Sequence, residues 1–571
     1  MTGIGAILPV RPHYREGDCG SDIDNNGSVS EGNLKVPRYA YARPVTPLIH
    51  TRLLQQWIAS CITEHHKCCE TRFSTPLSLA NIRLIDVRKR QLIVHDTSCR
   101  YIALSYVWGP KTTGLLTRAT LETFSREGSL GHGDLPRTIC DAISLVADLG
   151  ERYLWVDSLC IIQDDHSDKR QYLPMMGEIY NTAMMVVVAA VENAHSGLPG
   201  RGDYKRQQPR MTETIQGIDF TLGQPELWDY LPTTIWSTRG WTYQEAQLAR
   251  RTLFITDSQV YWSCCEAYWC EDRFTEFPTQ PRTSLVNPLL TYIRMVPSIR
   301  GNYPMPPILC LLGEYCQKAT EFSSRSVSDK GDIFWAFFGI LKSLLSRFPK
   351  GYIWGLPKEK LDSALLWRTN TSCELCKSLI VPSEKGEWQE VIMPSWCWIS
   401  KGTEVWYDEC YESVESMVEW HEPVRPLTGS QEEGDKEEKK PGNLQSAIFL
   451  SDHMSQESAL FDYALLHFTT ESAIFRMHTF RAFGPGNHFC SMGRATLSLL
   501  SGKDIGFIWL PVAEFFVKDE IQGEFILLSS MPFEAQSAKR ESKEPTNLLK
   551  ECLGLRSQNL FGMNANGRGK R

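Results

Sequence analysis

The position of Glu245 in this chain suggests chemistry. A helical wheel of residues 237–251, STRGWTYQEAQLARR, places this carboxylate on an apolar side with Trp241, Leu248, Ala249 and Thr252. The opposite side holds Tyr243, Gln247 and Arg250. Burial of an ionised carboxylate is costly unless the group is paired or has a function. Glu245 is therefore either a partner in a structural ion pair, for example with Arg239, or part of a site.

Other candidate site residues follow the predicted strands of the same region. The strand at 101–107 ends among Ser105, Tyr106, Trp108 and Gly109, and the next strand ends at Asp157. In an open parallel sheet, ligands bind beyond the carboxyl ends of the strands. These hydroxyls, rings and carboxylates are therefore predicted to converge on one edge together with Glu245. Neighbouring carboxylates raise each other's pKa, as acid–base chemistry requires.

Each of these residues also has a purely structural interpretation that the sequence leaves open. Trp108 could simply close the end of the sheet, because large aromatic side chains mostly serve packing. Asp157 could cap the turn that follows it. Asp164 and Asp165 precede a further polar run, His166-Ser167-Asp168, which favours a solvated loop over a site.

The elements that must position these residues alternate between strands and helices. Apolar runs at 101–107, 153–157 and 184–190 predict buried strands, and the periodicity of 135–150 and 170–181 predicts helices. After the Glu245 helix, TLFIT and VYWSC predict two further strands. This order indicates an α/β fold in which a parallel sheet is flanked by helices.

Potential metal ligands are present, but their spacing predicts no complete set. Cys61, His65, His66, Cys68 and Cys69 lie close together, yet the first two already occupy the apolar face of a predicted helix. Cys373 and Cys376 form half of a zinc ribbon without a second half at the usual distance. The three Cys of WSCCEAYWCED, residues 262–272, are ascribed to packing. We therefore predict no metal site.

Composition limits the class of protein. The 571 residues carry a formal net charge of −7, so no global basic field invites nucleic acid. No segment approaches the roughly 18 consecutive apolar residues of a membrane-spanning helix. The 18 Cys are scattered, and a chain of this length needs no disulfides, so we expect reduced thiols and a cytoplasmic location.

Changes in composition divide the chain into six predicted parts. These are a disordered segment at 1–45, an α/β domain at 46–275, a helical and mixed region at 276–427 that packs on it, a charged linker at 428–443, a β-rich region at 444–535 and a flexible tail at 536–571. The region after 275 is thus predicted to be a mixed α+β part.

Four blocks of the sequence, in this order, resemble the signature of the fungal heterokaryon incompatibility (HET) domain. They are YIALSYVWG (101–109), LPRTICDAISLVADLGERYLWVDSLCIIQDD (135–165), MGEIYNTAMMVVVAA (176–190) and STRGWTYQEAQLARRTLFI (237–255). Val107 stands where members often have Cys, a difference that lies within a strand. The resemblance implies a role in nonself recognition and regulated cell death, with this domain as the effector.

The resemblance also implies a distant likeness to TIR domains, which in catalytic members hydrolyse NAD with a Glu in a helix after the third strand. GWTYQE stands at the matching element, with Trp241 one turn before Glu245. The implied catalytic residue is Glu245, whose carboxylate would stabilise positive charge on the ribose as nicotinamide leaves. NAD is then a substrate and not a cofactor, and its implied contacts are Ser105, Tyr106, Trp108, Gly109, Asp157 and Trp241.

A second interpretation remains open at this point. The same domain could be a non-enzymatic death-signalling or scaffold module that acts by protein–protein assembly. Its partners would be further copies of the chain or a separate sensor protein, with no nucleic acid and no membrane span. Loss of NAD in the presence of the purified domain would distinguish the two.

Overall fold

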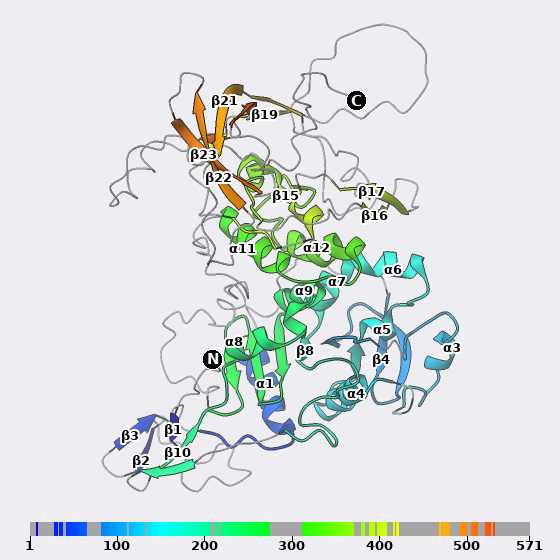
Figure 1. Cartoon of the computed structure of the whole chain (residues 1–571). Coiled ribbons are helices and arrows are strands. Elements are labelled where there is room, and N and C mark those ends of the chain that lie inside the picture. Colours follow the sequence, from blue (N-terminus) through cyan, green and yellow to red (C-terminus); the bar gives the residue numbers. More distant parts are fainter. Residues whose placement is uncertain are drawn as a thin grey trace. The chain divides into compact units, whose positions relative to one another are not determined.

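Buried apolar strands form the centre of one sheet in the computed structural model of the chain. The strand order is β13-β12-β11-β8-β6-β7-β4-β5 (Figure 1). The four central strands run parallel: β11 (Arg251–Ile255), β8 (Met185–Ala189), β6 (Ile102–Ser105) and β7 (Tyr153–Trp155). All five residues of β8 are buried, as expected for a strand with helices on both faces. The predicted parallel pairing of 101–107, 153–157 and 184–190 is confirmed.

The edges of this sheet are antiparallel, so the sheet as a whole is mixed. At one edge lie β12 (Val260–Cys264) and β13 (Tyr268–Cys270), and at the other lie β4 (Asn81–Asp86) and β5 (Gln91–Asp96). Residues 256–259 connect β11 to β12 and are too few for the crossover that a parallel pair needs. The short connections therefore turn the chain back on itself.

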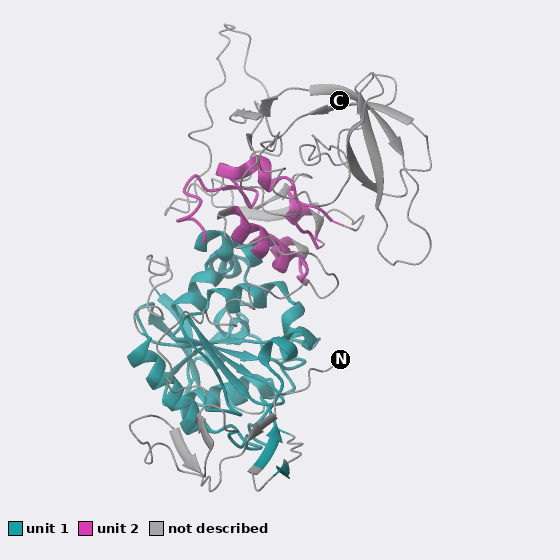
Figure 2. Ribbon diagram, turned by 90° about the vertical axis from the view of Figure 1, so that its left-hand side faces the viewer, with its two compact units in different colours: residues 1–299, 335–343 teal, residues 300–334, 344–571 magenta. Residues whose placement is uncertain are grey.

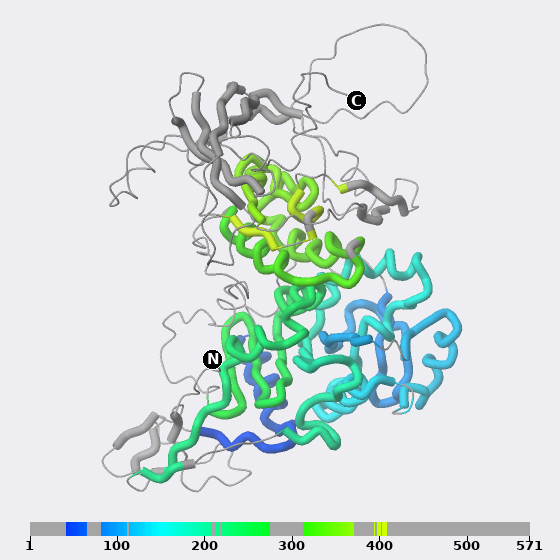
Figure 3. The backbone as a smooth tube through the Cα atoms, in the orientation of Figure 1, coloured from blue at the N-terminus to red at the C-terminus, as the bar shows by residue number. Residues whose placement is uncertain are grey.

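The structure describes residues 42–65, 81–110, 114–131, 133, 135–206, 218–274, 311–369, 397–402 and 404–407 (Figure 3). Further strands are assigned outside these ranges. The chain forms two compact units, the first made of 1–299 with 335–343 and the second of 300–334 with 344–571 (Figure 2). The predicted linker at 428–443 and tail at 536–571 lie outside the described residues, as does most of 1–45. The predicted domain boundaries stay predictions.

Helices of the first unit connect the parallel strands. α4 (Arg137–Asp148) joins β6 to β7, and it begins after Pro136 and is followed by Gly150 with φ +86°. Proline suits a helix start and glycine a left-handed end, and the helix predicted within 135–150 is confirmed. β7 leads through α5 (Asp157–Cys160) to the segment that returns to β8.

The single helix predicted at 170–181 is three shorter segments. They are α6 (His166–Tyr172), the 3₁₀ turn η2 (Leu173–Met175) and α7 (Met176–Thr182). Pro174 lies in the turn, where its missing N–H and its ring interrupt α-helical hydrogen bonding. α6 also starts earlier than predicted, because the Asp165 side chain accepts hydrogen bonds from the Ser167 and Asp168 N–H groups.

The strand order reverses direction at β6. The chain passes from β6 to β7 on one side, and then crosses to β8 on the other side. A crevice forms beyond the carboxyl ends of parallel strands at such a switch point. Ser105 is the last residue of β6 and therefore lies where the topology predicts a ligand site.

The remaining elements of the first unit cover the sheet or extend from it. They are α1 (Thr51–Glu64), α3 (Leu121–Phe124), α8 (Leu227–Tyr230), η3 (Leu231–Thr233), η4 (Trp236–Thr238), α9 (Gly240–Leu248), and the strands β1 (Ile7–Pro9), β2 (Ser28–Glu31), β3 (Leu34–Pro37), β9 (Thr212–Ile215) and β10 (Ile218–Leu222).

The second unit contains helices followed by antiparallel strands. Its helical elements are α11 (Leu311–Ser323), η5 (Lys330–Asp332), η6 (Lys358–Lys360), α13 (Leu361–Ala364) and η7 (Trp398–Lys401). Its short strand pairs include β14 (Tyr352–Ile353), β15 (Leu356–Pro357), β16 (Ser378–Pro382), β17 (Trp388–Ile392), β18 (Glu415–Ser416), β19 (Val418–His421), β20 (His467–Thr470) and β25 (Ser529–Ser530). A four-stranded sheet is built from β21 (Ser472–Thr479), β22 (Met492–Leu499), β23 (Asp504–Pro511) and β24 (Glu520–Ile526). Within the part of the chain that the structure describes, no helix has both the length and the apolar character to span a bilayer.

Residues 335–343 of α12 (Ile333–Ser343) belong to the first unit, where they contact α7 and α9. The Gly339 N–H donates to the Gln244 side-chain oxygen at 2.6 Å. A Cβ added at Gly177 would lie 2.8 Å from the Gly339 Cα atom and 2.9 Å from the Leu248 side chain. Two glycines therefore allow the backbones of α7 and α12 to approach closely.

Gly177→Ala is expected to destabilise the first unit. The added methyl group overlaps backbone atoms that cannot rotate away, and such overpacking costs roughly 1–3 kcal/mol. This loss should exceed the helix-propensity gain of about 1 kcal/mol from replacing glycine. Urea denaturation followed by Trp fluorescence measures the change, with Gly131→Ala as control, because nothing lies within 4 Å of a Cβ there. Unchanged or higher stability of Gly177→Ala would show that this approach is loose.

Candidate functional site

The Glu245 side chain of α9 meets the carboxyl end of β6. The Ser105 hydroxyl donates a hydrogen bond to the Glu245 carboxyl group. The Trp236 indole N–H donates to the same hydroxyl oxygen at 2.8 Å. All three residues are buried, and Glu245 is only 4% exposed. The prediction that Glu245 and the strand-end residues converge on one edge of the sheet is thus confirmed for Ser105.

The amphipathic pattern predicted for the Glu245 helix is wrong. Tyr243 and Gln247, assigned to the outer side, are buried, whereas Trp241 is partly exposed. Thr252 lies outside the helix, in β11. The reason is that α9 is enclosed on several sides, since it contacts β6, β8 and α7 and also receives the Gly339 hydrogen bond. Glu245 is therefore buried because the whole helix is buried.

Asp157 supplies a second carboxyl group at the same edge of the sheet. It begins α5 directly after β7, and it is half-buried. The Trp108 indole N–H donates to one carboxylate oxygen at 2.7 Å, and the Ser158 N–H donates to the other at 2.7 Å. Both structural alternatives therefore apply in part, because Asp157 binds the first turn of α5 and Trp108 packs against the core. The indole hydrogen bond joins the two residues into one partly exposed group.

The two carboxyl groups influence each other electrostatically. Burial, followed by the negative charge of Asp157, raises the pKa of Glu245 from its usual 4.5 to about 8. The hydrogen bond from Ser105, the charge of Arg239 and the Tyr180 hydroxyl act in the opposite direction. Burial also raises the pKa of Asp157, against the hydrogen bonds from Trp108 and Ser158 and the charge of Arg239. Glu245 is thus mostly protonated at neutral pH.

The other predicted site residues surround this pair. The buried Tyr106 donates from its hydroxyl to Ser158 at 2.8 Å, and burial raises the pKa of Tyr106 well above its usual value. Gly109 has φ +83°, and a Cβ there would lie 2.6 Å from the Asn193 side chain. That glycine is therefore needed for backbone geometry and close packing. Contacts of these residues with a ligand, and the concave shape of this edge, stay predictions.

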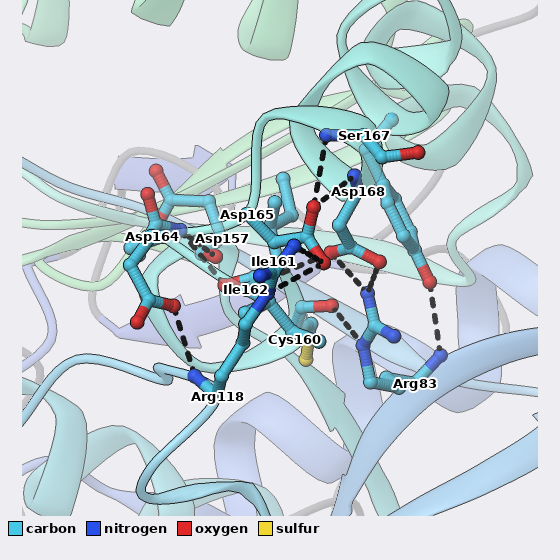
Figure 4. Close-up of polar contacts among 12 residues, drawn as sticks. Arg83, Arg118, Asp157, Cys160, Ile161, Ile162, Asp164, Asp165, Ser167 and Asp168 are labelled. Atoms are coloured by element: carbon cyan, nitrogen blue, oxygen red, sulfur yellow. Dashed lines mark hydrogen bonds and ion pairs between the residues drawn. The ribbon is translucent and has the colours of Figure 1, made fainter.

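Asp164, Asp165 and Asp168 have structural partners, and the polar run predicted as a solvated loop is instead the start of α6 (Figure 4). The Arg118 N–H donates to Asp164 at 2.8 Å, and the Arg118 guanidinium pairs with Asp165 at 3.0 Å. Asp168 forms an ion pair with Arg83, which also donates to the Cys160 carbonyl at 2.8 Å. These contacts hold α6 and the preceding loop against the sheet.

Sequence reasoning missed Trp236 and Tyr180. Trp236 lies in η4, immediately before α9, and Tyr180 lies in α7, where its hydroxyl donates to the Leu104 carbonyl at 3.1 Å. Each is an aromatic residue with a polar atom in a buried segment, and that atom must find a partner. Among the described residues, the group that could hold a metal ion is Cys61, His65 and Cys264, which shares no residue with this site.

Residues 101–245 match the family model described as Heterokaryon incompatibility protein (HET). The chain contains a HET domain. The matched range begins next to β6 and ends at Glu245, so it includes Ser105, Asp157 and the carboxyl group that they influence. The HET family assignment made from the four sequence blocks is confirmed.

The chain is also similar to a curated relative, Heterokaryon incompatibility protein 6, OR allele, from Neurospora crassa. The two are 30% identical over 275 residues, which cover 41% of this chain and 36% of the relative. The similarity therefore spans about a third of the relative's length. No solved structure matches the chain significantly. The likeness of the HET domain to TIR domains stays a prediction.

Glu245→Gln is expected to stabilise the HET domain at alkaline pH. The folded state holds the Glu245 proton with a pKa of about 8 against 4.5 when exposed, so its stabilising effect is complete below pH 4.5 and is lost as the pH rises to about 8. Gln keeps the neutral form throughout. The variant should match the wild type near pH 4 and exceed its unfolding free energy by about 4 kcal/mol at pH 8.

Urea denaturation at several pH values measures this difference. If Glu245 were instead an ionised partner in a buried ion pair, Gln would strand the cation. The variant would then be less stable by about 3–5 kcal/mol at pH 7. At pH 8, higher stability of the variant would therefore indicate a buried carboxyl group without an ion-pair partner, and lower stability would indicate an ionised partner in a buried ion pair.

Proposed function

We propose that the HET domain of this chain hydrolyses NAD, with Glu245 as the catalytic residue, as an effector of fungal heterokaryon incompatibility. The observation that carries the proposal is the buried Glu245 carboxyl group, hydrogen-bonded to Ser105 at the end of β6 and electrostatically coupled to Asp157. A strongly perturbed carboxyl group at a strand-end switch point is the arrangement expected of a catalytic site.

In the proposed reaction, the bond between the ribose C1′ atom and the nicotinamide nitrogen breaks. Its electron pair leaves with nicotinamide, which becomes neutral, and positive charge develops on the ribose. Water then attacks C1′ and releases a proton. An ionised Glu245 would stabilise the developing charge, and Ser105, fixed by Trp236, would hold the carboxylate in place.

The required ionisation is compatible with the raised pKa of Glu245. The nicotinamide ring of NAD carries a positive charge, and a nearby cation favours the charged form of a carboxyl group. Trp108 and Trp241 are partly exposed, and an indole ring can bind such a cation by a cation–π contact. Substrate binding would therefore supply the charge that ionises Glu245.

The biological part of the proposal is supported by the family match and by the printed name of the Neurospora relative. In this proposal, nonself recognition activates the chain in the cytoplasm, either through a separate sensor protein or through self-assembly of the chain. The trigger and the location are part of the proposal, because the similarity covers only about a third of the relative's length.

A non-enzymatic role is the second candidate, and a specific observation favours it. Glu245 is 4% exposed and already hydrogen-bonded, so its network with Ser105 and Trp236 could serve only to fix α9 on the sheet. In that case the HET domain would act by assembly, and the chemistry of Glu245 would be irrelevant to cell killing.

Incubation of the purified chain with NAD should deplete NAD with a kcat/KM that rises about tenfold per pH unit up to about pH 8 and then levels. The rising part of this pH profile reports the pKa of Glu245 in the enzyme without bound substrate. Asp157→Asn removes the negative charge that raises this pKa, and the rising part should move to lower pH. A kcat/KM that falls across this range would instead indicate a general acid and would contradict the proposed role.

Glu245→Gln should reduce NAD loss by at least about 10²-fold, because it removes the charge that stabilises the transition state. Asp164→Asn is the matched control, since it removes an exposed carboxylate from the loop between α5 and α6. Expression of each variant in a fungal host then compares NAD loss with cell death. A folded Glu245→Gln protein that kills like the wild type would favour assembly over catalysis.

A further inference from the structure

Three side chains that commonly bind metals meet between α1 and β12. Cys61 lies in α1, His65 caps the C-terminal end of that helix, and Cys264 is the last residue of β12. All three are buried, and one potential ligand atom from each lies within 4.8 Å of the other two. We propose that these residues form a structural zinc site that fastens α1 to the edge of the sheet.

The geometry is close to that of a tetrahedral zinc site. Cys61 and His65 are four positions apart, so they lie on one face of the helix. The Cys264 sulfur lies 3.5 Å from His65 Nδ1. Zinc bonds of about 2.3 Å to sulfur and 2.0 Å to nitrogen place two tetrahedral ligands roughly 3.6–3.8 Å apart. The ligand atoms therefore need to move by about 1 Å or less to bind one ion.

A hydrogen-bond donor lies against the sulfur atom of each of the two cysteines. The Arg251 guanidinium donates from Nε to the Cys61 sulfur at 3.2 Å. The Ala267 N–H donates to the Cys264 sulfur at 3.3 Å. Hydrogen bonds and positive charge stabilise the deprotonated sulfur that a metal requires, and such outer contacts orient metal ligands.

An aromatic group lies next to the cluster. The His65 ring lies 5.7 Å from the Trp269 ring, which also contacts Trp57 and Trp262 at 6.1 Å and 5.8 Å. A buried, aromatic environment excludes water and suits a structural ion better than a catalytic one. The two sulfurs and one imidazole select a soft or borderline ion, for which zinc is the usual choice.

Charge and protons balance in this proposal. Binding of Zn²⁺ displaces one proton from each thiol, and two thiolates with a neutral imidazole leave no net charge on the ion and its three ligands. Arg251 then adds one positive charge next to the site. The cluster supplies three of the four donors of a tetrahedral zinc site.

The spacing of the ligands makes Cys264 the decisive residue. It is 199 positions from His65, so it joins the site only when the domain is folded. Metal bound by the Cys- and His-rich segment around residue 65 alone would not depend on Cys264. Cys270 in β13 provides a matched control, because it is another buried thiol of the same hairpin.

The test uses the full chain, purified without a polyhistidine tag from zinc-supplemented cultures. Mass spectrometry of the metal content is expected to find zinc bound in equal amount to the protein, and Cys264→Ser should lower it at least about tenfold. Cys270→Ser should retain it. Zinc that is absent from the wild type, or retained in full by Cys264→Ser, would overturn the proposal.

Cobalt provides a second measurement that needs no variant. Co²⁺ titrated into the chelator-treated wild type should give the thiolate-to-metal absorption and the intense visible bands of a tetrahedral sulfur site. X-ray absorption of the zinc form should show two sulfur ligands. A zinc shell of nitrogen and oxygen alone would contradict the site even if Cys264→Ser fails to fold. NAD hydrolysis is not part of this test, so the two proposals can fail separately.

Discussion

Enclosure of α9 is the constraint on which the rest of the site depends. The helix contacts the sheet and α7, and it receives a hydrogen bond from α12, so a carboxyl group at its centre has little access to water. That desolvation is the largest cause of the raised pKa of Glu245. Ser105 and Trp236 provide a hydrogen-bonded position that makes the burial tolerable, because an unpartnered carboxyl group there would be far more costly. Close packing of Gly177 against Gly339 is part of the same enclosure.

Topology explains why residues far apart in sequence share this position. Ser105 ends β6, Asp157 follows β7, and the chain then crosses over β6 to reach β8 before it forms α9. The reversal of strand order brings the ends of two neighbouring strands and a later helix to one edge. Buried runs such as MMVVVAA were sufficient to predict the parallel strands, because a strand covered on both faces has no polar alternation. The edge strands are antiparallel because the connections to them are short, and the apolar character of a strand does not indicate the direction in which it pairs.

Glu245 could be singled out from sequence although the wheel that identified it misplaced its neighbours. An acid among apolar residues indicates burial whichever face is covered, but the wheel assumes one solvent side, and α9 has almost none. The balance of charges could not be ranked from sequence, since it depends on whether Asp157 or Arg239 lies closer to the carboxyl group. Trp236 and Cys264 could not be assigned for a related reason. Each acquires its partner from a segment more than a hundred positions away, and local periodicity contains no such information.

The arrangement of charges also restricts which end of a ligand could approach Glu245. A cation next to Glu245 and Asp157 would favour their ionised forms, which burial disfavours, and the ionised carboxylates would repel phosphate. Arg239 lowers the pKa of both groups and is itself partly exposed, so it is the member of this set suited to an anionic group. A ligand with a cationic ring and a pyrophosphate would therefore place its ring towards the carboxyl pair and its phosphates towards Arg239. NAD has this distribution of charge, and a neutral nucleoside lacks both ends of it.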